Sequence, residues 1–243
     1  MKQVAPLVLA SSFLLSPFPA SAQTLSLTGG INFTSVATET GLAANYDSAK
    51  RLFAGVAATV PIAGSFHVRL GASFSQKGNF YALDQIVPDD PNYPTFGTLE
   101  PYLDLHLKMG YVEFTALASL ASAVSGGPVA VRVLAGPAIG LLASCKATGT
   151  EYEEGRPSTT MTVSCPDEAQ IATLDLGLAA GAGLNVELTD RLGVTADLLY
   201  THGLRDAGDV WVGSDPGDIN RELDLSAKHR TLTLNAGLTY SIR

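Results

Sequence analysis

The stretch IATLDLGLAAGAGLNVEL, residues 171–188, alternates large apolar side chains with polar or small ones. Successive side chains of a β-strand point to opposite faces of the sheet, so this alternation predicts a strand with one apolar face. Strands of soluble proteins are usually about 5–6 residues long, whereas a strand that crosses a bilayer at a tilt needs about 9–11 residues. The stretch therefore predicts a membrane-spanning strand that continues beyond the bilayer.

The same alternation recurs along the chain. In residues 229–242, Leu232, Leu234 and Leu238 share one face and threonines share the other. In all, the pattern predicts eight strands, at residues 25–36, 51–60, 66–77, 99–120, 129–144, 171–188, 192–204 and 229–242. Within the fourth of these, the apolar residues before Gly110 and after Tyr111 have opposite parity, which predicts a β-bulge at that point.

The connections between these segments fall into two kinds. Three are short, at residues 61–65, 121–128 and 189–191. Four are long and polar, at residues 37–50, 78–98, 145–170 and 205–228. Short turns that alternate with long loops are typical of bacterial outer-membrane barrels, with the short turns on the periplasmic side. Because lipid offers no partner to free backbone groups, such a sheet must close on itself. We therefore expect an all-β fold, an eight-stranded antiparallel up-and-down transmembrane β-barrel.

The composition is consistent with this class. The chain has 243 residues, of which 46% are hydrophobic and 16% charged, and its mean hydropathy is +0.21. No stretch after the N-terminus reaches the ~18 apolar residues of a membrane helix, and the apolar content is too high for a disordered chain. The formal net charge is −8, with 15 Lys and Arg spread singly. The sequence therefore excludes a basic nucleic-acid-binding protein.

The N-terminus has the features of an export signal. Lys2 precedes an apolar run from Val4 to Leu15, and Ala20-Ser21-Ala22 is a small-residue cleavage pattern. We expect residues 1–22 to be a cleaved signal peptide and residues 23–243 to form the barrel domain, located in the bacterial outer membrane.

Export also changes the interpretation of the two cysteines, Cys145 and Cys165. An oxidising compartment favours a disulfide between them, which would close a Thr-, Ser- and Gly-rich loop at residues 146–164. In the chain-entropy model such a closure stabilises the fold by about 3 kcal/mol. A redox or metal site, the alternative, would require closer spacing and His partners that are absent here.

Several charged residues have the parity of the inward face. Isolated charges in a narrow interior are costly, so they should pair with one another. This predicts a salt-bridge network that plugs the lumen, and a proton or ion path is the functional alternative. The predicted members are Arg69, Glu113, Arg132, Asp175, Glu187 and Asp197.

The sequence evidence for a catalytic site is weaker than that for the salt-bridge network. His202, with Ser73 or Ser75, is the nearest approach to a nucleophile and base, but no nucleophile motif surrounds these residues. We therefore expect no catalytic residues, no metal site and no cofactor. A water-filled pore is also disfavoured, because open channels need about 16–18 strands.

Five segments resemble the PorT-like outer membrane β-barrel family, over nearly all of the chain that follows the signal. They are Phe74–Gly78, Gly110–Phe114, Val133–Leu142, Gly181–Leu184 and Leu198–Leu204. Thr115 stands where members of this family usually have Pro. The resemblance implies an eight-stranded barrel but no shared activity.

Together these features predict an integral outer-membrane protein with a plugged lumen and long extracellular loops, in a structural, interaction or secretion-accessory role. A lipid-modifying hydrolase and a narrow small-solute channel are the alternatives. The expected partners are outer-membrane lipid or lipopolysaccharide, a protein at the extracellular loops, and the barrel-assembly machinery. That machinery reads a terminal aromatic residue, for which Tyr240 is the substitute because the chain ends in Ile242-Arg243.

Overall fold

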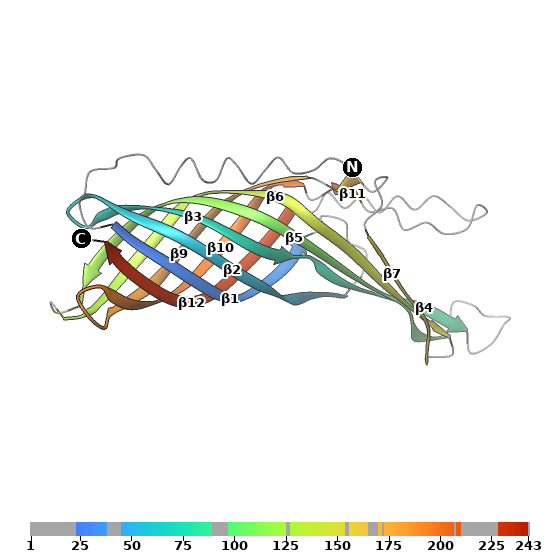
Figure 1. The fold of residues 1–243 in the computed structure, drawn as a ribbon. Coiled ribbons are helices and arrows are strands. Elements are labelled where there is room, and N and C mark those ends of the chain that lie inside the picture. The colour runs from blue at the N-terminus through green and yellow to red at the C-terminus, as the bar shows by residue number, and fades with distance from the viewer. Residues whose placement is uncertain are drawn as a thin grey trace.

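The structure is a computed structural model, shown in Figure 1. It describes residues 23–37, 45–88, 97–124, 127–153, 156–164, 170–171, 173–206, 208–209 and 228–242. The predicted signal peptide and Cys165 lie outside the described residues, so the cleavage site and the Cys145–Cys165 disulfide stay predictions.

Eight strands form a closed ring in which every neighbouring pair is antiparallel. The ring closes between the first and the last strand, which pair from Gln23 opposite Ile242 to Ala37 opposite Lys228. This confirms the predicted up-and-down β-barrel. In order round the ring the strands are β1 (Gln23–Ala37), β2 (Asn45–Ala63), β3 (Phe66–Lys77), β5 (Gly97–Ala123), β6 (Val129–Glu153), β9 (Leu174–Glu187), β10 (Leu192–Asp206) and β12 (Lys228–Ile242).

The two faces of the barrel wall differ as the alternation predicts. On β12, Thr231, Thr233 and Asn235 are buried inside the ring, whereas Leu234 and Leu238 are 52% and 60% exposed. An apolar outer face of this kind suits a hydrocarbon environment. Other strongly exposed apolar residues on the ring strands are Leu27, Ile31, Leu52, Val56, Leu120, Val133, Ile139, Leu141, Leu178, Leu184 and Leu198.

The short connections all lie at the end of the barrel where β1 begins and β12 ends. They join β2 to β3 at Gly64-Ser65, β5 to β6 across residues 124–128, and β9 to β10 across residues 188–191. This is the end expected to face the periplasm. No helix among the described residues is long and apolar enough to cross a membrane.

At the opposite end the sheet continues beyond the barrel (Figure 1). The strand β4 (Asn79–Pro88) pairs with β2 and β5, and β7 (Arg156–Ser164) pairs with the outer part of β6. We call this part, formed by β4, β7 and the outer parts of β5 and β6, the outer sheet. A further pair, β8 (Gln170–Ile171) and β11 (Gly208–Asp209), forms a separate small sheet.

The outer sheet corrects two predicted loops. Residues 78–98 and 145–170 were expected to be irregular, yet much of both is strand. Residues 146–164 are rich in Thr, Ser and Gly, and residues 78–98 contain three prolines and three aspartates. Neither segment carries a long alternation of apolar and polar residues, so both compositions predict loops. Polar contacts hold the outer sheet: the Tyr152 hydroxyl donates a 2.7 Å hydrogen bond to Asp104, and this bond raises the pKa of Tyr152.

Gly78 sits where β3 leaves the barrel and β4 begins. Its φ is +129°, in the region that favours glycine. The hydroxyl of Thr34 donates a hydrogen bond of 2.5 Å to its carbonyl. The glycine therefore allows the chain to pass from the ring into the outer sheet.

The structure has a bulge at the predicted level, but its extra residue lies on β6 and not on β5. Tyr111 pairs with Leu142 and Gly110 with Ser144, so the extra residue is Ala143 of β6. Along β5, Leu107, Met109, Tyr111 and Glu113 are all buried, which shows that this strand keeps one phase. The side chains of Leu107 and Met109 thus face inward because β5 keeps its phase, and the charged Lys108 between them is exposed on the outer face.

Candidate functional site in the barrel lumen

Polar side chains line much of the inward face of the ring strands, and several of them form hydrogen bonds across the lumen. Asn32 of β1 is fully buried. Its amide nitrogen donates to Ser75 Oγ at 2.9 Å and to the Gln76 carbonyl at 3.0 Å, and its amide oxygen accepts from the Thr233 hydroxyl at 2.8 Å. Such contacts across three strands hold the wall in a fixed shape.

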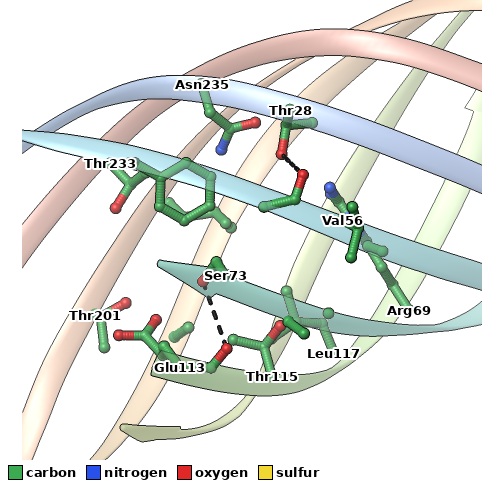
Figure 2. A pocket seen from close by; sticks show the side chains of 17 residues that line it. Thr28, Val56, Arg69, Ser73, Glu113, Thr115, Leu117, Thr201, Thr233 and Asn235 are labelled. Atoms are coloured by element: carbon green, nitrogen blue, oxygen red, sulfur yellow. Dashed lines mark hydrogen bonds between the residues drawn. The ribbon is translucent and has the colours of Figure 1, made fainter. Parts of the chain in front are cut away.

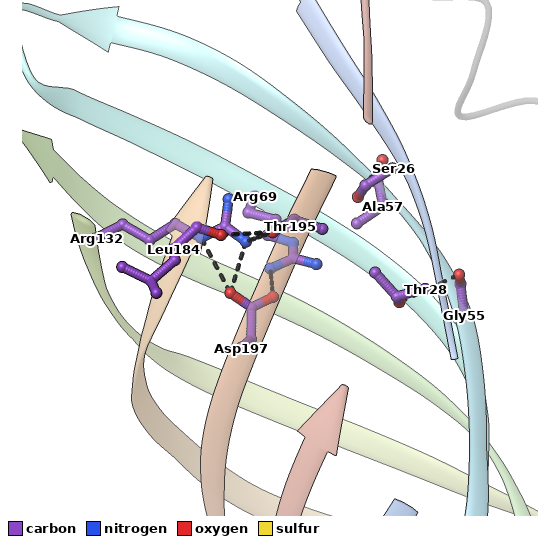
Figure 3. A network of polar contacts seen from close by, with 9 residues as sticks. All are labelled: Ser26, Thr28, Gly55, Ala57, Arg69, Arg132, Leu184, Thr195 and Asp197. Carbon is purple, nitrogen blue, oxygen red and sulfur yellow. Dashed lines mark hydrogen bonds and ion pairs between the residues drawn. The ribbon is translucent and has the colours of Figure 1, made fainter. Parts of the chain in front are cut away.

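The first ion network joins Arg69, Arg132 and Asp197, which are drawn in Figure 3. Arg69 and Arg132 are near the starts of β3 and β6, so the network lies toward the short turns. Asp197 of β10 forms two salt bridges. Its Oδ2 lies 2.6 Å from a guanidinium nitrogen of Arg69 of β3, and its Oδ1 lies 2.5 Å from a guanidinium nitrogen of Arg132 of β6. Arg132 also donates to the Thr195 hydroxyl. The Asp197 side chain has no exposed surface. Two guanidinium groups thus share one buried carboxylate, and three strands are tied across the lumen.

The second ion network lies toward the outer sheet. Lys77, the last residue of β3, contacts Glu113 of β5 at 2.8 Å and Asp175 of β9 at 2.7 Å. Its ammonium also lies 5.4 Å from the centre of the Tyr111 ring, a distance suited to a cation–π contact. Here one cation serves two carboxylates, the reverse of the first network.

Beyond the second network the lumen becomes apolar. Leu107, Met109 and Tyr111 form a buried cluster, and Leu142, Cys145 and Ala147 pack against it. The ring of His229 meets that of Tyr111 edge to face, with centroids 6.0 Å apart. Tyr111 is fully buried, and its ring lies inside the lumen.

A cavity of about 40 Å³ remains between the two networks (Figure 2). Its lining includes Arg69 from the first network and Glu113 from the second, together with Ser73, Thr201 and Asn235. This volume suits one or a few water molecules. Water there would meet the buried Asn235 Oδ1, which has no hydrogen-bond partner among the described residues.

The structure brings most of the predicted charges together. Arg69, Arg132 and Asp197 form one network, and Glu113 and Asp175 belong to the other. Glu187 does not join them: it is exposed at the end of β9, where the strand has left the barrel interior.

Sequence reasoning missed Lys77, the centre of the second network. The signal was present, because Lys77 continues the inward parity of Arg69, Ser73 and Ser75 along β3. No group of three or more His, Cys, Asp or Glu side chains suited to a metal ion occurs in the described part of the chain.

The chain is similar to several solved bacterial outer-membrane proteins. Neisserial surface protein A is 14% identical, with a TM-score of 0.42 over 90% of this chain and 98% of that one. Ail, the attachment invasion locus protein of Yersinia pestis, is 14% identical, with a TM-score of 0.38 over 89% and 97%. A major outer membrane protein from Thermus thermophilus is 18% identical, with a TM-score of 0.48 over 91% and 99%.

No curated protein matches the sequence. A family model does match: it is described as outer membrane protein beta-barrel domain, and it covers residues 21–208. The closed ring, its apolar outer face and this match lead to one conclusion, that the chain belongs to the outer membrane protein beta-barrel family and resides in the bacterial outer membrane.

Proposed function

We propose that this protein is a closed, non-enzymatic barrel that anchors an interaction surface outside the membrane. The observation that carries the proposal is the outer sheet: β5 and β6 extend from the ring and are joined there by β4 and β7. Strands that continue beyond the bilayer add no contact with lipid. Their use is to present a surface to something outside the cell.

The filled lumen supports the closed state. Two buried ion networks and the Leu107–Tyr111 cluster occupy the lumen between the described residues, and the cavity of about 40 Å³ between the networks has room for water alone. An eight-stranded ring is just wide enough for side chains to fill. A narrow solute channel would require both networks to break at once, which removes partners from buried charges at a large cost.

The geometry argues against the hydrolase alternative. Ser73 and Ser75 lie on the inward face of β3, where Ser73 lines the cavity and Ser75 is buried. His202 has the parity of the exposed residues Leu198 and Tyr200, on the outward face of β10. A base and a nucleophile on opposite sides of the wall cannot come within hydrogen-bond reach.

The proposal includes the narrower PorT-like assignment and a secretion-accessory role. Two of the segments that carry the resemblance, Gly110–Phe114 and Val133–Leu142, pair with each other in β5 and β6. The expected partners remain outer-membrane lipid or lipopolysaccharide round the apolar face, the barrel-assembly machinery, and a protein at the outer sheet.

Single-channel conductance in planar bilayers tests whether the lumen is closed, and assays with phospholipid and peptide substrates test whether the protein is an enzyme. The purified protein should give no steady single-channel conductance, and it should hydrolyse neither phospholipid nor peptide. Steady conductance steps from the wild type would overturn the closed barrel. Hydrolysis that is lost in both Ser73→Ala and His202→Ala would overturn the non-enzymatic role.

A further inference from the structure

We propose that β7 pairs antiparallel with β7 of a second copy of this chain, held in a facing membrane. The proposal rests on the outer sheet being an interaction surface, and it names the partner. It makes this protein a homotypic contact between two outer membranes.

Within the part of the chain that the structure describes, the sheet edge at β7 is open. Among the described residues β7 pairs with β6 alone and ends the order of strands in the sheet, whereas β4 lies between β2 and β5. A strand at a sheet edge carries a row of unpaired N–H and C=O groups, which is a template for another strand.

This edge lacks the usual protection against pairing. Natural edges carry charges, prolines or bulges, and here these are confined to the tip. Arg156 and Pro157 begin the strand, and Ser158 is an extra residue opposite the Glu151–Tyr152 step of β6. From residue 158 to residue 164 the sequence STTMTVS has no charge. In a chain of net charge −8, an uncharged strand is where two copies can meet without repulsion.

The segment is also self-complementary. A two-fold axis beside Met161 places Ser158 opposite Ser164 of the second copy and Thr160 opposite its Thr162, while Met161 faces itself. The remaining pair, Thr159 and Val163, joins two β-branched residues of the same shape. An interface between two copies about a two-fold axis needs this symmetry, because each residue meets its symmetry partner.

Hydroxyl pairs already run across the outer sheet and would continue into the second copy. Thr148 contacts Thr162 at 3.0 Å, and Thr150 contacts Thr160 at 3.3 Å. In the pairing described, Thr162 lies next to Thr160 of the second copy, so each row would extend over four strands. Cross-strand Thr–Thr pairs of this kind stabilise sheets.

The antiparallel direction sets where the second copy sits. In the outer sheet β6 leaves the barrel and β7 runs back toward it (Figure 1). Antiparallel pairing reverses the strand direction of the second copy, and with it the direction of the barrel to which that strand leads. The two barrels therefore lie at opposite ends of the shared sheet and occupy two facing membranes.

One such contact is short and therefore weak, but many act together between two surfaces. Proteoliposomes of the full chain should consequently aggregate, as measured by light scattering. Met161 is 63% exposed, so charged variants there should fold normally. Met161→Lys and Met161→Glu vesicles should each fail to aggregate, because like charges meet at the axis, and a mixture of the two should aggregate again.

Leu188→Lys provides the matched control, since Leu188 is 62% exposed but lies at the periplasmic turn. These vesicles should aggregate like the wild type. The proposal fails if wild-type vesicles stay dispersed, if single charges have no effect, or if the mixture shows no rescue. A dimer in detergent without vesicle aggregation would also overturn the facing-membrane geometry. Conductance measured on the same preparation tests the closed barrel separately.

Discussion

Asp197 is the residue on which the turn-side half of the lumen depends. It is the sole carboxylate in contact with Arg69 and Arg132 among the described residues. We predict that Asp197→Ala lowers the free energy of unfolding by about 3–5 kcal/mol, because two buried guanidinium groups lose their counter-charge. Urea unfolding, followed by the loss of the compact band on unheated gels, measures the change. Glu187→Ala, at an exposed acid outside the network, should change stability by about 0.5 kcal/mol or less.

Lys77 plays the complementary role near the outer sheet. Lys77→Met leaves Glu113 and Asp175 buried without a cation, and it should destabilise the barrel by a similar amount, about 3–5 kcal/mol. The triple variant Lys77→Met, Glu113→Gln, Asp175→Asn should recover most of this loss, because it removes the carboxylate charges as well. If the triple variant is no more stable than Lys77→Met, charge pairing is not what Lys77 contributes.

At the scale of the residue, the sequence predicts which face of the strand a side chain occupies, but it does not predict which residue that side chain contacts. Strand parity places Arg69, Arg132 and Asp197 on the inward face, and it would have placed Lys77 there too. It does not reveal that Asp197 meets Arg69, which is 128 residues away in the chain. That contact depends on the stagger of strands round the ring, which only the closed barrel sets.

At the scale of the strand, the apolar outer face determines how deeply each residue sits in lipid. Leu234 lies near the middle of β12 and Ile242 at its periplasmic end, and they are 52% and 44% exposed. We predict that Leu234→Arg costs about 2–4 kcal/mol and Ile242→Arg about 0–1 kcal/mol, because a charge is most costly at the bilayer midplane. Refolding into lipid vesicles at several urea concentrations measures both. Equal costs would place the membrane band elsewhere along β12.

Strands outside the lipid are where sequence reasoning fails. The sequence predicts a loop at residues 156–164, because this short Thr-rich segment has only Met161 and Val163 as large apolar residues and so shows no long apolar stripe. The phase of β5 was mistaken for a related reason. The apolar Leu107 and Met109 lie on the inward face of β5, so apolar parity predicts the wrong face there, and the extra residue of the bulge is Ala143 of the neighbouring strand. Alternation therefore identifies strands well within the bilayer and poorly beyond it.

At the scale of the whole molecule, the barrel depends on closing β1 against β12, the two ring strands farthest apart in the chain. Closure leaves little room at Gly30, which pairs with Asn235 across this seam. A Cβ at Gly30 would clash with the Leu234 carbonyl oxygen, its nearest neighbour, and would lie 2.7 Å from the Asn235 Cα, closer than real contacts allow. At Gly29, one residue earlier, the nearest atom would be 3.9 Å away.

Substituting each of these neighbouring glycines by alanine therefore distinguishes an effect on barrel closure from an effect on strand formation. We predict that Gly30→Ala costs about 1–3 kcal/mol through overpacking of the seam, whereas Gly29→Ala changes stability by about 0.5 kcal/mol or less. The measurement is the fraction of refolded protein that migrates as a compact band before heating and as an extended band after it. The two variants add the same methyl group to the same strand, on the exposed outer face at Gly29 and against the β1–β12 seam at Gly30, so a difference in yield reports the crowding at the seam. Equal yields would mean that the β1–β12 seam can widen without cost, and that the ring is less tightly closed than its register implies.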